Sequence, residues 1–127
     1  MPKIIWGDEP ADHDYPAAKS FLSLLAAPAD VDQIIESYAN LPVEIIKVKD
    51  VIRASSLILL PKSNFHVHKD LVKIRDKKVL SPILLVRGTG NLAQHLTIAD
   101  GYHRACAVYW NSEDDFIHAK IADWAIN

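Results

Sequence analysis

The spacing of hydrophobic residues changes several times along this chain and divides it into expected helices and strands. Apolar positions three and four residues apart predict helices, whereas alternation or a short continuous apolar run predicts a strand. Helices are expected at 16–25, 30–40 and 102–110, with a short helical turn at 50–54 and a basic helix that follows 63–70 and ends by 78. Strands are expected at 43–48, 83–86, 95–99 and 116–121, and 57–60 is expected to be a buried run closed by Pro61.

Residues 1–42 are expected to form an N-terminal two-helix extension. The first helix has Pro16 near its first turn and an apolar face formed by Phe21, Leu24 and Leu25. The second begins at Asp30, which with Gln33 resembles a capping box, and its apolar positions are Val31, Ile34, Ile35 and Tyr38. The sequence leaves open whether these faces cover the sheet of the same domain or a second copy of the chain in a homodimer.

The order of these elements indicates an α+β fold. Short strands interleaved with helices, two of them joined by a hairpin turn at 87–91, favour a mixed sheet flanked by helices. A chain of 127 residues, half of them hydrophobic, has the size of one domain. We therefore expect a single domain, 1–127, in which the extension precedes a core at 43–122.

Charge is distributed unevenly, although the net charge is only −2. Residues 1–46 carry two basic and eight acidic residues, whereas 47–87, the basic middle, carry ten basic and three acidic residues. The basic middle could meet nucleic acid or a nucleotide, but pairing with the acidic segment of the same or a neighbouring chain is the favoured interpretation. The overall acidity argues against strong non-specific DNA binding.

No apolar run approaches the roughly 20 residues that span a membrane. Acidic residues follow the N-terminus closely, so we expect no membrane segment, no secretory signal and a cytoplasmic location. Cys106 is the only cysteine, which excludes an intrachain disulfide. Its place beside Ala105, Val108 and Tyr109 predicts a buried, inert thiol.

Two groups of potential metal ligands are interpreted as structural. The first group, Asp8, Asp12, His13 and Asp14, is expected to be a solvated loop before a helix. The second group, His66 and His68, lacks a third convergent ligand and is expected to lie on the surface. We therefore predict no resident metal.

The most informative chemistry lies where an apolar run ends at Asp100 and Gly101 and a helix begins. A helix start presents unpaired N–H groups and the positive end of the helix dipole, and both attract anions. Gly101 permits close approach of the backbone, and His103 and Arg104 add donors, so the turn favours a phosphate. Local chemistry leaves open a structural interpretation in which Asp100 caps the helix and Arg104 is solvated.

The residues Asp100-Gly101-Tyr102-His103-Arg104, with the strand at 80–86 before them, resemble the ParB/sulfiredoxin superfamily, whose members carry a D-G-x-H-R or G-E-R-R turn at a helix start. The similarity covers 43–122. It implies a compact mixed sheet and binding of a nucleotide, such as ATP, ADP or CTP with Mg²⁺, or of a phosphorylated small molecule. The implied binding residues are Asp100, Gly101, Tyr102, His103, Arg104 and Arg53.

Branches of this superfamily imply different activities. Sulfiredoxins have their nucleophilic cysteine where this chain has Tyr102, and partitioning ParB proteins have a glutamate there, so neither activity is expected. The D-G-H-H-R turn of kinase-like members differs only at Tyr102. This resemblance implies a phosphotransferase or NTPase, with His103 and Asp50 as candidate catalytic residues, although the favoured interpretation of Asp50 is that it caps a helical turn. The alternative is a non-enzymatic, DNA-associated regulator or protein-interaction module.

Overall fold

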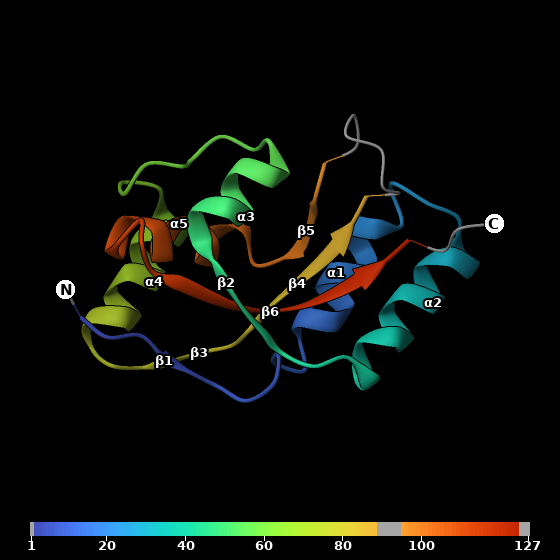
Figure 1. Cartoon of the computed structure of the whole chain (residues 1–127), viewed down its shortest axis with the longest axis horizontal. Coiled ribbons are helices and arrows are strands. Elements are labelled where there is room, and N and C mark those ends of the chain that lie inside the picture. Colours follow the sequence, from blue (N-terminus) through green and yellow to red (C-terminus); the bar gives the residue numbers. More distant parts are fainter. Residues whose placement is uncertain (1, 89–94, 125–127) are drawn as a thin grey trace.

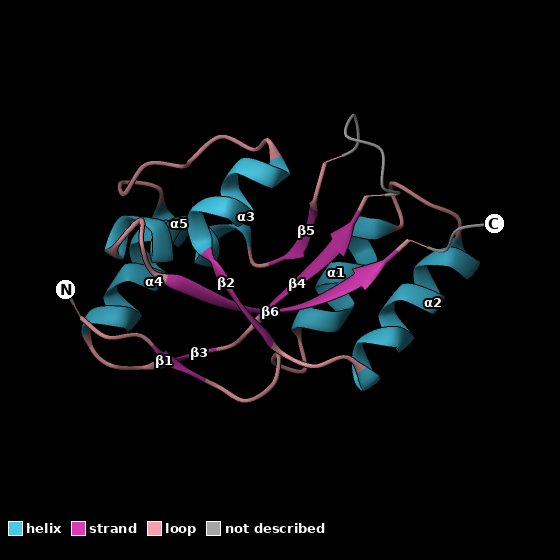
Figure 2. Cartoon of the chain, in the orientation of Figure 1, coloured by secondary structure: helices cyan, strands magenta, loops and turns pink. Residues whose placement is uncertain are grey.

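A computed structural model describes residues 2–88 and 95–124. Its elements are, in chain order, β1 (Ile5–Trp6), α1 (Asp14–Leu22), α2 (Pro28–Ser37), the 3-10 helix η1 (Tyr38–Asn40), β2 (Glu44–Lys47), α3 (Val48–Ser55), α4 (Phe65–Arg75), β3 (Val79–Leu80), β4 (Ile83–Arg87), β5 (Thr97–Asp100), α5 (Tyr102–Asn111) and β6 (Phe116–Asp123). The described part of the chain is thus a mixture of helices and strands, as the α+β expectation requires (Figures 1 and 2). Most of the expected hairpin turn lies outside the described residues.

The strands form a four-stranded mixed sheet in the order β2-β6-β4-β5. The strand β6 pairs in parallel with β4 and antiparallel with β2, while β4 and β5 run antiparallel. A separate two-residue parallel ladder joins β1 to β3, so that the N-terminal segment lies beside the chain that enters β4 (Figure 1). This ladder places the acidic N-terminal loop next to the start of α5.

Alternate residues of β4 face two different hydrophobic clusters. Ile83 and Leu85 pack with apolar residues of α3, α4 and α5, whereas Leu84 and Val86 pack with those of α1, α2 and η1. Since successive side chains of a strand point to opposite faces, the sheet lies between two helical layers. The prediction of a buried strand at 83–86 is confirmed, and the N-terminal helices cover the sheet of their own chain.

The expected apolar face of the first helix is wrong. Phe21, Leu24 and Leu25 are exposed, Leu24 by 83%. The buried positions of α1 are Asp14, Ala18 and Leu22, which are spaced by four residues. The helix begins at a buried, paired carboxylate, and this contact turns a face with only two apolar residues toward the sheet. The prediction of a solvated loop therefore also fails at Asp14.

The second helix was predicted correctly in its buried positions and wrongly at its start. Val31, Ile34 and Tyr38 are buried, and the Tyr38 hydroxyl donates a hydrogen bond of 2.8 Å to the Leu85 carbonyl oxygen. The helix begins at Pro28, so Asp30 lies in the first turn and makes no capping box. Proline without an N–H is well suited to the first helical position, and this favours the earlier start.

The run 57–60 was expected to be buried, but it is an irregular connector between α3 and α4. Leu57 and Ile58 are exposed. The connector is held through its backbone instead, because the Tyr102 hydroxyl donates to the Ile58 carbonyl (2.5 Å) and the Trp110 indole N–H to the Leu60 carbonyl (2.7 Å). Directly before it, the expected turn at 50–54 is the longer helix α3.

Cys106 is fully buried in α5, as predicted, and burial raises the pKa of its thiol. We predict that a thiol reagent labels the native protein slowly, because the thiolate is the reactive form. Replacement by serine is expected to lower the free energy of unfolding by about 1–3 kcal/mol, since a hydroxyl would be buried among apolar side chains. Rapid labelling without denaturant would contradict this prediction.

No helix within 2–88 or 95–124 combines the length and the hydrophobicity that a membrane-spanning helix needs.

Candidate functional site

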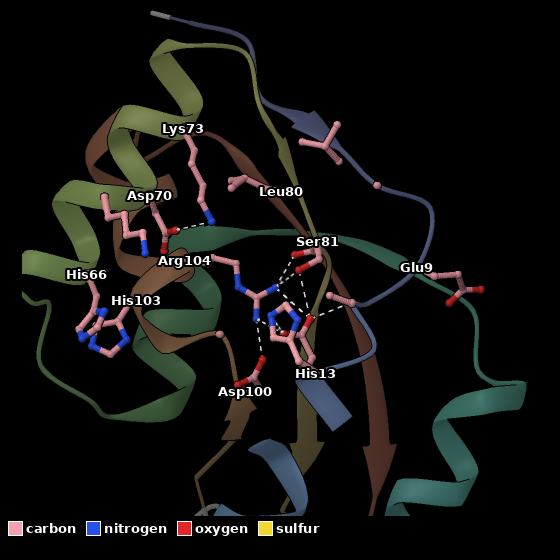
Figure 3. Close-up of a pocket in the computed structure, with 16 residues that line it drawn as sticks. Glu9, His13, His66, Asp70, Lys73, Leu80, Ser81, Asp100, His103 and Arg104 are labelled. Carbon is pink, nitrogen blue, oxygen red and sulfur yellow. Dashed lines mark hydrogen bonds and ion pairs between the residues drawn. The ribbon is translucent and has the colours of Figure 1, made fainter. Parts of the chain in front are cut away.

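A pocket of about 560 Å³ opens where the N-terminal segment, β3, α4 and the start of α5 meet (Figure 3). Pockets for small ligands occupy roughly 300–1,000 Å³. Helix α4 contributes His66, Lys69, Asp70 and Lys73 to its lining. The turn into α5 contributes Asp100, Gly101, His103 and Arg104, and the opposite wall includes Glu9, His13, Asp14 and Ser81. A pocket of this size with convergent polar groups is the strongest candidate site in the described part of the chain.

Arg104 connects three segments that are distant in sequence. One terminal nitrogen donates to the Ser81 carbonyl oxygen (2.7 Å), contacts Ser81 Oγ and lies 3.3 Å from Asp14 Oδ2. The other donates to Asp100 Oδ2 (2.7 Å) and to Asp14 Oδ1 (3.4 Å). The Arg104 side chain is only 12% exposed. Arg104 is therefore not solvated, and the donors that we expected to face a phosphate already bind protein oxygens.

The two carboxyl groups that share Arg104 differ in acidity. Burial, followed by hydrogen bonding with Asp14, raises the pKa of Asp100 to about 6. Burial would also raise the pKa of Asp14, but the charge of Arg104 and hydrogen bonds to the carboxylate hold it below its usual value. Two neighbouring carboxyls with pKa values moved apart are typical of acid–base pairs. Asp100 is thus the group of this pair that could exchange a proton near neutral pH.

Gly101 has a φ of +113° immediately before α5, a conformation that side chains disfavour. A Cβ at this position would lie 2.3 Å from Cγ2 of Ile83. The sequence predicted close approach of the backbone to a ligand, and the structure shows close approach to a strand side chain. Asp100 does not cap α5, and no other side chain in the described residues does so. The first N–H groups of α5 consequently have no capping partner.

His103 and His66 lie together at one side of the pocket (Figure 3), with ring centroids 4.7 Å apart. Burial, then the nearby His66, lowers the pKa of His103. A neutral imidazole at neutral pH can accept or donate a proton. Burial raises the pKa of Asp70, against the opposing charge of Lys73, whose Nζ lies 3.9 Å away.

Comparison with known proteins assigns no family to this chain. No protein-family model, curated protein or solved structure matches the chain. The function must therefore be argued from the pocket itself.

The structure brings some of the predicted site residues together in the pocket. Asp100, Gly101, His103 and Arg104 line the pocket, whereas Tyr102 turns its hydroxyl to the connector. Asp50 and Arg53 do not line it; they form an exposed pair on α3, with Arg53 Nη2 3.1 Å from Asp50 Oδ1.

Sequence reasoning missed the pocket residues on α4 and in the N-terminal loop. In the sequence Lys69 and Lys73 look like the solvated face of a basic helix, and only the contact between α4 and α5 shows that they line the pocket. The expected pairing of the basic middle with the acidic segment is not found within the chain: among the described residues, no ion pair joins 47–87 to 1–46. Glu9 and Asp14 pair instead with Lys120 and Arg104, which follow the basic middle.

The described residues contain no cluster of three or more His, Cys, Asp or Glu side chains arranged to hold a metal ion.

Proposed function

We propose that this pocket binds a nucleotide or another phosphorylated small molecule, with a phosphate beside the first turn of α5. The observation that supports this most strongly is the convergence of Lys69, Lys73 and three histidines on a pocket at an uncapped helix start. Ammonium groups, imidazole N–H groups and the N–H groups of a helix start are all donors to phosphate oxygens. The size of the pocket suits a nucleotide better than inorganic phosphate alone.

The carboxylates of the pocket do not prevent anion binding. Arg104 lies between Asp14 and Asp100, so a large part of their negative charge is compensated within the protein. Glu9 pairs with the buried Lys120, with 2.7 Å between Oε2 and Nζ. Lys69 and Lys73 then face only Asp70 among the remaining acids of the lining. Asp100 could also contribute an oxygen ligand to a Mg²⁺ ion carried by the nucleotide.

The same groups would serve a phosphotransferase or NTPase reaction. Asp100 and His103 both line the pocket and are candidate proton acceptors for an attacking hydroxyl or water. Asp50 and Arg53 lie outside the lining and have no part in the proposed chemistry. The resemblance of Asp100–Arg104 to the D-G-x-H-R turn of the ParB/sulfiredoxin superfamily supports nucleotide binding at this helix start.

Replacing Lys69 by methionine is expected to raise the Kd for the nucleotide about tenfold to a hundredfold, because a charge-assisted hydrogen bond contributes about 1.5–3 kcal/mol. A thermal-shift screen with ATP, ADP, CTP and GTP, each with Mg²⁺, selects the nucleotide, and calorimetric titration measures the Kd. Lys78→Met is the matched control, because Lys78 is exposed and does not line the pocket. Equal loss of affinity in both variants, or no binding at millimolar nucleotide, would refute the proposal.

A binding module for an acidic partner such as DNA is the second candidate. It is favoured by the five basic residues of α4 and the turn that follows it, Lys69, Lys73, Arg75, Lys77 and Lys78, all of them exposed. DNA binding of this kind weakens steeply with salt. A salt-sensitive gel shift that Lys78→Met weakens as much as Lys69→Met would favour this function over the pocket.

A further inference from the structure

We infer that the ligand carries an aromatic base and that this base stacks against a row of four rings, of which two, His66 and His103, line the pocket. This inference rests on the proposed function. The row comprises Phe65 and His66, the first two residues of α4, and Tyr102 and His103, the first two residues of α5. Successive ring centroids are 5.3 Å apart for Phe65 and His66, 4.7 Å for His66 and His103, and 5.7 Å for His103 and Tyr102.

The row is continuous with the phosphate side of the pocket. His66 and His103 both line the pocket, and His103 is only two residues from the left-handed Gly101 at the start of α5. A ligand whose phosphate contacts this helix start would therefore have its organic part within reach of the rings.

Phe65 is the outermost ring and has no obvious structural purpose. Phe65 is the first residue of α4 and is 72% exposed. The side chain of Asn64 fixes this position, because its Oδ1 accepts hydrogen bonds from the backbone N–H groups of His66 (3.0 Å) and Val67 (3.2 Å). An exposed aromatic ring in edge contact with His66, a residue of the pocket lining, is suited to contact a flat ligand group.

Stacking explains the combination of rings better than hydrogen bonding does. Every nucleobase has a π-face, so stacking on aromatic side chains supports binding without selecting a particular base. We therefore expect purine and pyrimidine nucleotides to bind, with a large advantage of either over a phosphate chain that lacks a base.

The test compares ATP with inorganic tripolyphosphate, both with Mg²⁺, by calorimetric titration. Wild type is expected to bind ATP at least tenfold more tightly than tripolyphosphate. Phe65→Ala is expected to raise the Kd for ATP about tenfold and to leave the Kd for tripolyphosphate unchanged, while Phe65→Trp restores ATP binding. Phe116→Ala is the matched control, since Phe116 is also exposed but lies on β6 and is not one of the four rings.

The outcomes separate this inference from the proposed function. If both compounds bind with similar Kd and Phe65→Ala changes neither, base stacking is wrong and phosphate binding stands. If Phe65→Ala weakens both compounds equally, the ring acts on the pocket as a whole and base stacking is again wrong. If neither compound binds, the proposed function fails and the inference fails with it.

Discussion

Replacing Arg104 by alanine is expected to lower the free energy of unfolding by about 3–5 kcal/mol, the effect typical of removing one partner from a buried ion pair. Asp14 and Asp100 would lose the positive charge that they share, and the Asp14 side chain is only 4% exposed. Three segments, around Asp14, Ser81 and Asp100, would also lose the donors that hold them together. Urea unfolding followed by circular dichroism measures this difference.

Arg53→Ala is the matched control for Arg104→Ala. Arg53 forms an exposed ion pair with Asp50, and exposed pairs contribute about 0–1 kcal/mol. A second comparison removes the uncompensated charges: Asp14→Asn combined with Asp100→Asn in the Arg104→Ala background is expected to recover part of the lost stability. Equal, small effects of Arg104→Ala and Arg53→Ala would show that Arg104 does not hold these segments together.

Gly101→Val is expected to prevent folding or to lower the free energy of unfolding by more than about 4 kcal/mol, a loss reserved for substitutions with a specific steric cause. The new Cβ would overlap Ile83, and the positive φ would add strain. Thermal unfolding measures the loss. Gly101→Ala is expected to lower the stability as well, because its Cβ would lie 2.6 Å from the Cβ of Ile83, an atom that truncation of the isoleucine to alanine would not remove.

Gly7→Ala is the control for these glycine substitutions. Its Cβ would lie 3.3 Å from Cγ1 of Val79, an exposed side chain that can move. The effect is expected to stay below about 1 kcal/mol, as for most surface substitutions. Gly90, in the expected hairpin turn at 87–91, lies outside the described residues. Normal stability of Gly101→Val would show that the turn tolerates a side chain and would remove the structural reason for glycine there.

The sequence predicted best those elements whose hydrophobic pattern shows directly which of their faces is buried. The continuous run 83–86 is a central strand, and the turn at Asp100 and Gly101 leads directly into α5. It predicted poorly where a polar contact decided the orientation of an element. Nothing near Asp14 in the sequence indicates that its carboxylate pairs with Arg104, ninety residues away, and this contact determines which face of α1 is buried.

The candidate site could be predicted at only one of its walls. The helix start at Gly101 is visible in the sequence because glycine marks it and because the apolar residues change there from a continuous run to helical spacing. Lys69 and Lys73 could not be assigned to the site, because a basic helix face is ordinarily solvated. The carboxylate partners of Arg104 could not be predicted either, since a guanidinium near a helix start looks the same in sequence whether it binds a ligand or two carboxylates.

The central claim is that a phosphorylated ligand binds at the start of α5, and two-dimensional ¹H–¹⁵N NMR tests it most directly on this 127-residue chain. The labelled protein is titrated with ATP and Mg²⁺, and the shifts of assigned amide signals are mapped onto the structure. We expect the largest shifts at Gly101, His103 and the Lys69–Lys73 part of α4, with little change in α2, which covers the opposite face of the sheet. Absence of shifts at millimolar ATP, or shifts centred on Asp50 and Arg53 of α3, would contradict it.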